Sequence, residues 1–161
     1  SASHVVLINS FSRFIPAGKE KRSVIMALKR MMNEINTPKD PTMLRKFHIK
    51  AHKPNDVDMD STELNLFHMH EKGRSRLKND LKLLMDSDSL PTGLNTDAKV
   101  LVINSEKDFI LANQTKEQLT EDLINYLEIE PSIINLQEEG HWISKINSIK
   151  IIKHWLEFGH A

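Results

Sequence analysis

The chain has 161 residues, of which 39% are hydrophobic, and its 22 Lys and Arg residues balance 22 Asp and Glu residues. This composition supplies a sizeable core and excludes a disordered chain, and the neutral net charge does not call for nucleic acid or a membrane as a partner. The chain has no cysteine, which excludes disulfides, thiolate zinc sites and a cysteine nucleophile. No apolar run approaches the roughly 20 residues that span a bilayer, and no signal peptide is recognisable, so we expect a cytoplasmic protein.

The first expected element is a strand followed by a loop. Residues 4–8 form a short, continuous β-branched run, which is typical of a strand covered on both faces of a parallel sheet. Residues 9–16 are rich in turn formers and contain two phenylalanines. The pattern therefore predicts a buried core strand that ends in an aromatic loop.

Four amphipathic helices are expected between residues 19 and 86. The first ends at Pro38, and the second begins at Asp40 with a proline at its first helical position. The third is capped by Ser61 and stops at Gly73, and the fourth follows with leucines at helical spacing. These helices form an insertion between two strands.

Strands and helices alternate in the rest of the chain. Residues 100–103 and 132–136 predict the second and third buried strands. Thr115 and Gln118 have the spacing of a capping box for the helix between them, and a final helix ends at Gly159. This alternation implies parallel strands with right-handed crossovers, so the predicted fold class is α/β.

Three buried strands are too few to make a parallel sheet with two protected edges. The first strand also has no sequence-adjacent partner. We therefore expect more sheet to come from an N-terminal half, from another chain or from a swapped dimer.

Two polar residues follow the second and third strands and are the first candidates for chemistry. Asp108 lies a few residues beyond the second strand, and His141 lies a few residues beyond the third. Ligands bind at the carboxyl ends of strands in open α/β sheets, so neighbouring strands would bring both side chains to one edge. A carboxylate there accepts the imidazole Nδ1 proton, and the imidazole serves as general base to a hydroxyl nucleophile. Gly140 is expected to permit a tight turn that presents the ring.

The combined pattern resembles the C-terminal half of the α/β-hydrolases. The segment 100–108 is similar to their penultimate core strand, which ends in the triad acid, and Gly140-His141 is similar to the segment that carries the triad base. The helical insertion has the position of their cap domain. The segment 6–11, the four-helix cap and its basic face resemble the pimeloyl-[acyl-carrier protein] methyl ester esterases of biotin synthesis.

The sequence departs from that pattern in its nucleophile. These hydrolases carry their serine in Gly-x-Ser-x-Gly, ahead of the acid and the base, and none of the five glycines here frames such a motif. The His-Gly oxyanion segment is also absent, and the proline that often follows the acid is replaced by Phe109-Ile-Leu. We expect residues 1–16 to form a core strand and active-site loop, 17–95 the cap, and 96–161 the core that carries the acid and the base.

Four phenylalanines are candidates for an acyl pocket between cap and core, because ligand pockets are mostly apolar. Two of them follow the first strand at the presumed active-site edge, and two lie on predicted cap helices; they are Phe11, Phe14, Phe47 and Phe67. The alternative for the cap residues is a place in the core of the helices.

The front of the chain is basic, with ten Lys or Arg against three Asp or Glu in residues 17–53. The resemblance implies that this face could dock an acidic acyl carrier protein, through Arg22, Arg30, Arg45 and Lys46. The alternative is an ordinary solvated helix face. No aromatic platform or nucleic-acid motif accompanies the charge, so nucleic acid is not expected as a partner.

His48 and His52 have the i, i+4 spacing of metal ligands on a helix. The glutamate that would complete the usual motif is missing, so we expect neither a metal nor another cofactor.

The resemblance implies a carboxylic ester hydrolase that works through an acyl-enzyme, with Asp108 orienting His141 and His141 activating a serine outside this chain. The chain alone would then be inactive. The same acid–base arrangement also serves hydrolases with an Asp nucleophile, so the identity of the nucleophile stays open. The alternative from another class is a non-catalytic module that binds an acidic partner through its basic cap.

Overall fold

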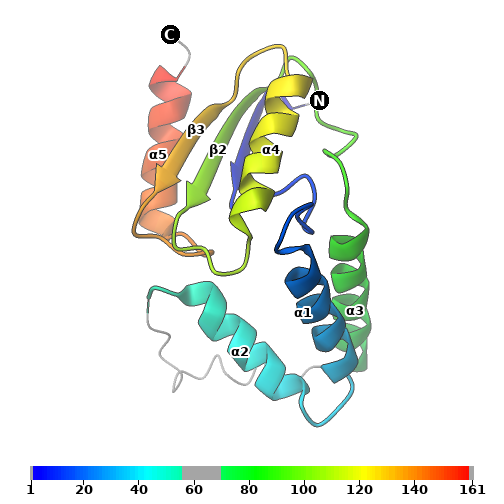
Figure 1. Ribbon diagram of the computed structural model, residues 1–161. Helices are drawn as coiled ribbons and strands as arrows, with labels where there is room; N and C mark the ends of the chain where they lie inside the picture. Colours follow the sequence, from blue (N-terminus) through cyan, green and yellow to red (C-terminus); the bar gives the residue numbers. More distant parts are fainter. Residues whose placement is uncertain (1, 56–69, 160–161) are drawn as a thin grey trace.

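The structure is a computed structural model that describes residues 2–55 and 70–159 (Figure 1). In chain order its elements are β1 (His4–Ile8), α1 (Lys21–Glu34), α2 (Asp40–His52), α3 (Glu71–Asp86), β2 (Lys99–Ser105), α4 (Asn113–Tyr126), β3 (Ser132–Leu136) and α5 (Lys145–Phe158). The order of strand, helices and then alternating strands and helices is the predicted α/β arrangement.

The three strands form one parallel sheet in the order β1-β2-β3. β2 is the middle strand, and its residues from Val100 to Ser105 are all buried. Its continuous β-branched sequence suits this position, because a central parallel strand is covered on both faces and paired on both edges. The register places Ile8 beside Ile103 and Ser105 beside Leu136, so all three strands end at the same edge of the sheet.

The side chains of β2 alternate between the two faces of the sheet, and each face is covered by one helix (Figure 1). Val100 and Val102 pack in a cluster with Leu119 and Leu123 of α4. Leu101 and Ile103 pack in a second cluster with Trp155 of α5, which is 5% exposed. The twofold repeat of the strand therefore divides its apolar residues between two helices.

Helices α1, α2 and α3 form a helical layer with a core of its own. Four buried side chains make this core, and Met31 and Met32 pack against it; the four are Leu28, Ile35, Met43 and Leu81. The layer follows β1 in the chain and precedes β2, which is the position predicted for an inserted cap.

Two helix boundaries differ from the sequence prediction. Gly73 does not end a helix but lies in the first turn of α3, which begins at Glu71. Most of the third cap helix expected from Ser61 to Gly73 lies outside the described residues. A glycine marks a helix end only where the chain needs its conformational freedom, and the backbone of Gly73 is ordinary helix.

The predicted capping box at Thr115 and Gln118 is also wrong. Helix α4 begins at Asn113, after Ala112 as its N-cap, so Thr115 lies in the first turn. Its hydroxyl donates to the carbonyl oxygen of Phe14 at 3.2 Å instead of capping the helix. The tertiary contact with the loop after β1 takes the hydroxyl that the local pattern assigned to the helix end.

Across residues 2–55 and 70–159, no helix has both the length and the apolar composition that crossing a bilayer requires. The cytoplasmic location stays a prediction.

Candidate active site

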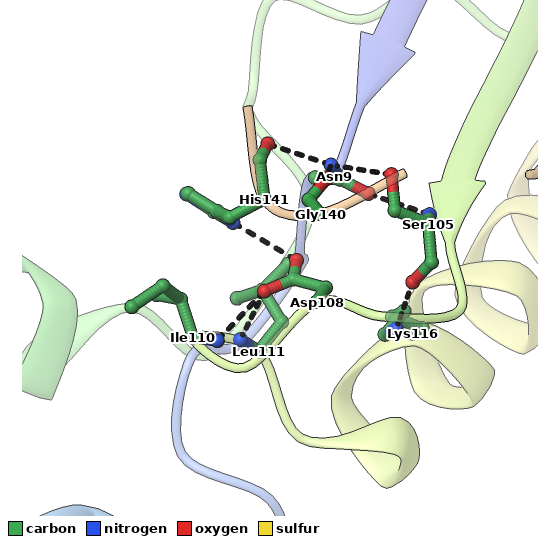
Figure 2. A network of polar contacts seen from close by, with 8 residues as sticks. All are labelled: Asn9, Ser105, Asp108, Ile110, Leu111, Lys116, Gly140 and His141. Carbon is green, nitrogen blue, oxygen red and sulfur yellow. Dashed lines mark hydrogen bonds and ion pairs between the residues drawn. The ribbon is translucent and has the colours of Figure 1, made fainter. Parts of the chain in front are cut away.

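Asp108 and His141 lie in contact at the carboxyl edge of the sheet (Figure 2). The distance between His141 Nδ1 and Asp108 Oδ2 is 2.9 Å. The Asp108 side chain is fully enclosed, with 0% of its surface exposed, whereas 21% of the His141 side chain is exposed. A buried carboxylate therefore faces one nitrogen of a ring that still reaches solvent.

Two neighbouring loops bring these residues together. The loop after β2 carries Asp108, and the loop after β3 carries His141. The backbone N–H of Glu106 donates to Leu136 O at 2.9 Å, which continues the pairing of the strands to the start of both loops. An exposed ion pair between Lys107 and Glu138 also joins the two loops. The sheet register therefore fixes the separation of the acid and the base.

The second carboxylate oxygen of Asp108 is held by its own loop. Asp108 Oδ1 accepts the backbone N–H groups of Ile110 at 2.7 Å and of Leu111 at 3.1 Å. Burial raises the pKa of Asp108, but the hydrogen bonds from His141, Ile110 and Leu111 favour the carboxylate, and the net pKa is lowered from 3.8. Asp108 is therefore ionised at neutral pH and accepts a hydrogen bond from the Nδ1–H group of His141.

The loop around His141 is fastened to the start of α5. Glu139 is 9% exposed, and its carboxylate accepts the backbone N–H of Ser144 at 3.2 Å and the Asn147 side-chain amide at 2.5 Å. Ser144 is the N-cap of the helix, and its side chain accepts from Asn147 N. A carboxylate at this position suits the positive end of the helix dipole, so the loop has a fixed connection to α5.

The helical layer approaches the same loop at the end of α2. The backbone N–H of Trp142 donates to Ala51 O at 3.4 Å. A Cβ atom on Gly140 would overlap the carbonyl oxygen of Lys53. The tight turn expected at Gly140 does not use left-handed backbone angles, because no described glycine has a positive φ. Gly140 is required by the close approach of the α2 end.

Asn9, Ser105 and Lys116 are part of the site, and the sequence analysis did not single them out (Figure 2). The Asn9 side chain bonds to Ser105, Gly140 and His141. Lys116 Nζ donates to the Ser105 carbonyl oxygen at 2.7 Å. The one sequence signal was a polar residue directly after the first strand, which is the same signal that led to Asp108.

The predicted pocket phenylalanines are distributed between the loop and the helical layer. Phe11 and Phe14 contact each other edge to face, with ring centroids 5.3 Å apart. Phe14 packs against the core of the helical layer, and Phe47 is half-buried on α2. Phe67 lies outside the described residues. Substrate binding by these residues stays a prediction.

The predicted basic residues lie on α1 and α2. Arg22, Arg45 and Lys46 are exposed, and Arg30 pairs with Glu34 at 2.9 Å. Arg30 also lines a surface hollow of about 570 Å³ that α1 and the following loop form, together with Lys29 and Lys39. A role in binding a partner stays a prediction.

His48 and His52, the pair considered for a metal, stack on each other with ring centroids 5.4 Å apart. Both rings contact Trp142 edge to face, at 4.7 and 4.2 Å between centroids. The two histidines thus form an aromatic contact between α2 and the residue that follows His141.

Solved structures with a similar fold include an esterase, a hydrolase and an enol-lactonase. An esterase from Exiguobacterium antarcticum superposes with a TM-score of 0.66 at 16% identity, over 99% of this chain and 57% of its own. A hydrolase from Oleispira antarctica gives 0.69 at 14% identity, over 97% and 56%. The enol-lactonase from Burkholderia xenovorans LB400 gives 0.66 at 12% identity, over 99% and 56%.

The chain has the fold of the C-terminal part of an α/β-hydrolase. It spans little more than half the length of these structures. No family model matches the sequence, and no curated protein matches it. The likeness is therefore one of fold, and it extends over nearly the whole chain.

The approach of α2 to Gly140 predicts the effect of a small substitution. Gly140→Ala is expected to lower the free energy of unfolding by about 1–3 kcal/mol, because the added methyl overlaps the backbone of Lys53 and the loop or α2 must move. Gly93→Ala is the matched control, since a Cβ there meets nothing within 4 Å. Urea unfolding of both variants measures the difference, and equal stability of the two would contradict the close approach.

The lowered pKa of Asp108 predicts a pH dependence. Because the folded-state pKa lies below its ordinary value of 3.8, the carboxylate contributes stability above that pH, and the contribution is lost as the pH falls through the lowered pKa. Asp108→Asn is expected to cost about 1–3 kcal/mol at pH 7, and the difference from the parent should persist to pH ~5 and shrink below ~4.

Urea unfolding across this pH range tests the expectation. Asp80→Asn, which changes a carboxylate with a 56% exposed side chain, is the control and should show no comparable cost. A cost for Asp108→Asn that grows as the pH falls below 4 would contradict the assigned direction of the pKa shift.

Proposed function

We propose that this chain supplies the acid and the base of a carboxylic ester hydrolase. The observation that carries the proposal is the 2.9 Å contact between a fully enclosed Asp108 carboxylate and His141 Nδ1 at the carboxyl edge of a parallel sheet. The hydrolase fold of the chain supports the same conclusion, because this edge is where α/β sheets bind ligands.

In this proposal Asp108 holds the His141 ring with its proton on Nδ1, which leaves Nε2 to accept a proton. His141 Nε2 removes the proton of a hydroxyl nucleophile as its oxygen attacks the ester carbonyl carbon. The imidazolium then donates that proton to the departing alcohol, which leaves an acyl-enzyme. Water, activated by the same nitrogen, releases the acid and restores the nucleophile. The ionised Asp108 stabilises the imidazolium in both steps.

We propose that the nucleophile is a serine on a segment of sheet that pairs with β1. Among the described strands β1 pairs with β2 alone, so its other edge offers unpaired backbone groups to a further strand. A residue at the carboxyl end of that strand would lie at the same sheet edge as Asp108 and His141. The segment could belong to the same gene product, to a second chain or to a swapped dimer.

Hydrolysis of p-nitrophenyl esters by the complete gene product tests the function. His141→Gln is expected to lower kcat/KM by about 10³-fold or more, and Asp108→Asn by up to about 10⁴-fold through the wrong tautomer. The 161-residue chain alone should give no turnover. His154→Gln, which changes an exposed histidine on α5, is the matched control. Full activity of His141→Gln would exclude the proposed mechanism.

A narrower proposal is that the ester is carried by an acidic acyl carrier protein, as in the pimeloyl-[acyl-carrier protein] methyl ester esterases. It is supported by the exposed cations Arg22, Arg45 and Lys46 on the helical layer and by the basic hollow around Arg30. Opposite charges raise the rate of encounter between partners and are screened by salt. Docking without hydrolysis is the alternative, and the same surface would serve it.

Charge reversal separates these possibilities. Arg45→Glu with Lys46→Glu is expected to raise KM for a carrier-bound ester about tenfold at low salt and to leave hydrolysis of a free ester unchanged. Lys150→Glu with Lys153→Glu on α5 is the matched control. Equal KM values for the two double variants would contradict docking on the helical layer. Carrier binding without any ester hydrolysis by the complete product would favour the non-catalytic module.

A further inference from the structure

We propose that Asn9 is the positioning residue of the Asp108–His141 pair. It lies directly after β1 and outside both catalytic loops, and its side chain ties the loop that carries His141 to the end of β2 (Figure 2). The inference deepens the proposed function and rests on it.

The Asn9 side chain uses both of its polar atoms, and the residue is 5% exposed. Its Oδ1 accepts the backbone N–H of Ser105 at 2.8 Å. Its Nδ2 donates to Ser105 Oγ at 3.0 Å, to Gly140 O at 3.1 Å and to His141 O at 2.7 Å. One side chain thus contacts both the last residue of β2 and the loop after β3.

These partners explain why the position needs an asparagine. The carbonyl oxygens of Gly140 and His141 require a donor, whereas the N–H of Ser105 requires an acceptor. A side-chain amide provides both within two bonds of the Cβ atom. The backbone φ of Asn9 is 40°, in the left-handed region that Asn adopts more readily than most residues with a side chain.

His141 is consequently held at two points. Its backbone carbonyl oxygen accepts from Asn9 at 2.7 Å, and its ring contacts Asp108 at 2.9 Å. Ser105, three residues before Asp108, is held from two sides, because its N–H donates to Asn9 and its carbonyl oxygen accepts from Lys116. Asn9 therefore joins the start of the Asp108 loop to the segment that carries His141.

Loss of the Asn9 amide should release the relative position of acid and base without detaching either loop. The His141 loop would stay connected to α5 through Glu139, and Asp108 would keep its bonds from Ile110 and Leu111. The His141 ring would then hold its proton on Nδ1 less completely, because that tautomer depends on a fixed contact with the carboxylate. A residue that only stabilises the fold would leave the tautomer unchanged.

The test measures the tautomer of His141 in the ¹⁵N-labelled complete gene product by long-range ¹H–¹⁵N spectra. His141→Gln assigns the signals, and Asp108→Asn gives the tautomer ratio of a ring without the carboxylate. Asn9→Asp keeps the shape of the side chain and its tolerance of a positive φ. It replaces the amide donor with a carboxylate oxygen, which cannot donate to the carbonyl oxygens of Gly140 and His141. Its ratio of Nδ1–H to Nε2–H forms is expected to fall roughly three- to tenfold, the size of one net hydrogen bond. Asn9→Gly, which keeps φ and removes the amide, should shift the ratio in the same direction.

Asn36→Asp is the matched control, because Asn36 is exposed and also has a positive φ of 69°. A parental tautomer ratio in folded Asn9→Asp or Asn9→Gly would overturn the proposal. If Asn9→Asp does not fold, Asn9→Gly decides, and failure of both to fold would also overturn it by assigning Asn9 to folding. The tautomer is read without any ester, so a complete product that hydrolyses none would refute the proposed function and leave this result standing.

Discussion

The burial of β2 on both faces and both edges is the constraint on which the rest of this structure depends. The strand can satisfy its backbone only by pairing in parallel with β1 and β3, and it can bury its alternating side chains only beneath two helices. Parallel pairing brings the carboxyl ends of all three strands to one edge. Asn9, Ser105, Asp108 and His141 lie at that edge or in the loops directly beyond it, and Lys116 reaches the edge from α4.

An enclosed carboxylate at that edge is costly unless its oxygens are bonded. The N–H groups of Ile110 and Leu111 in the loop after β2 donate to the carboxylate and offset this cost, and the His141 ring bonds to its other oxygen. The same bonds keep the pKa of Asp108 low, so that the group is ready as a hydrogen-bond acceptor at neutral pH. The hydrogen bond with His141 that helps to stabilise the buried Asp108 carboxylate is thus also the one that orients the imidazole.

The helical layer is connected to this chemistry through the backbone. The end of α2 contacts the His141 loop at Ala51 and Lys53, and its two histidines pack on Trp142. A displacement of α2 would therefore act directly on the segment that carries the base. In the proposed hydrolase, a layer that selects the substrate would also be in contact with the group that activates the nucleophile.

Sequence patterns predicted the three strands, the α/β class and a shared sheet edge for Asp108 and His141, whereas the contact between the two side chains comes from the structure. Apolar runs marked all three strands, but the predicted burial holds only for β2, because β1 and β3 lie at the edges of the sheet and their residues are half-buried or exposed. Residues that follow neighbouring parallel strands meet at one edge of the sheet. The helix ends were predicted less well. The local pattern allowed the hydroxyl of Thr115 to cap a helix, but in the folded chain it bonds to the distant Phe14.

The parts of the site that join distant segments follow from the tertiary structure alone. The bonds of Asn9 cross 96 residues to Ser105 and 132 residues to His141, and Gly140 is required by the approach of Lys53 rather than by its own turn. Local sequence patterns reflect interactions between residues that are close together in the chain. A side chain such as Asn9, whose partners come from the end of β2 and from the loop after β3, leaves no such pattern, because its environment exists only once the strands are paired.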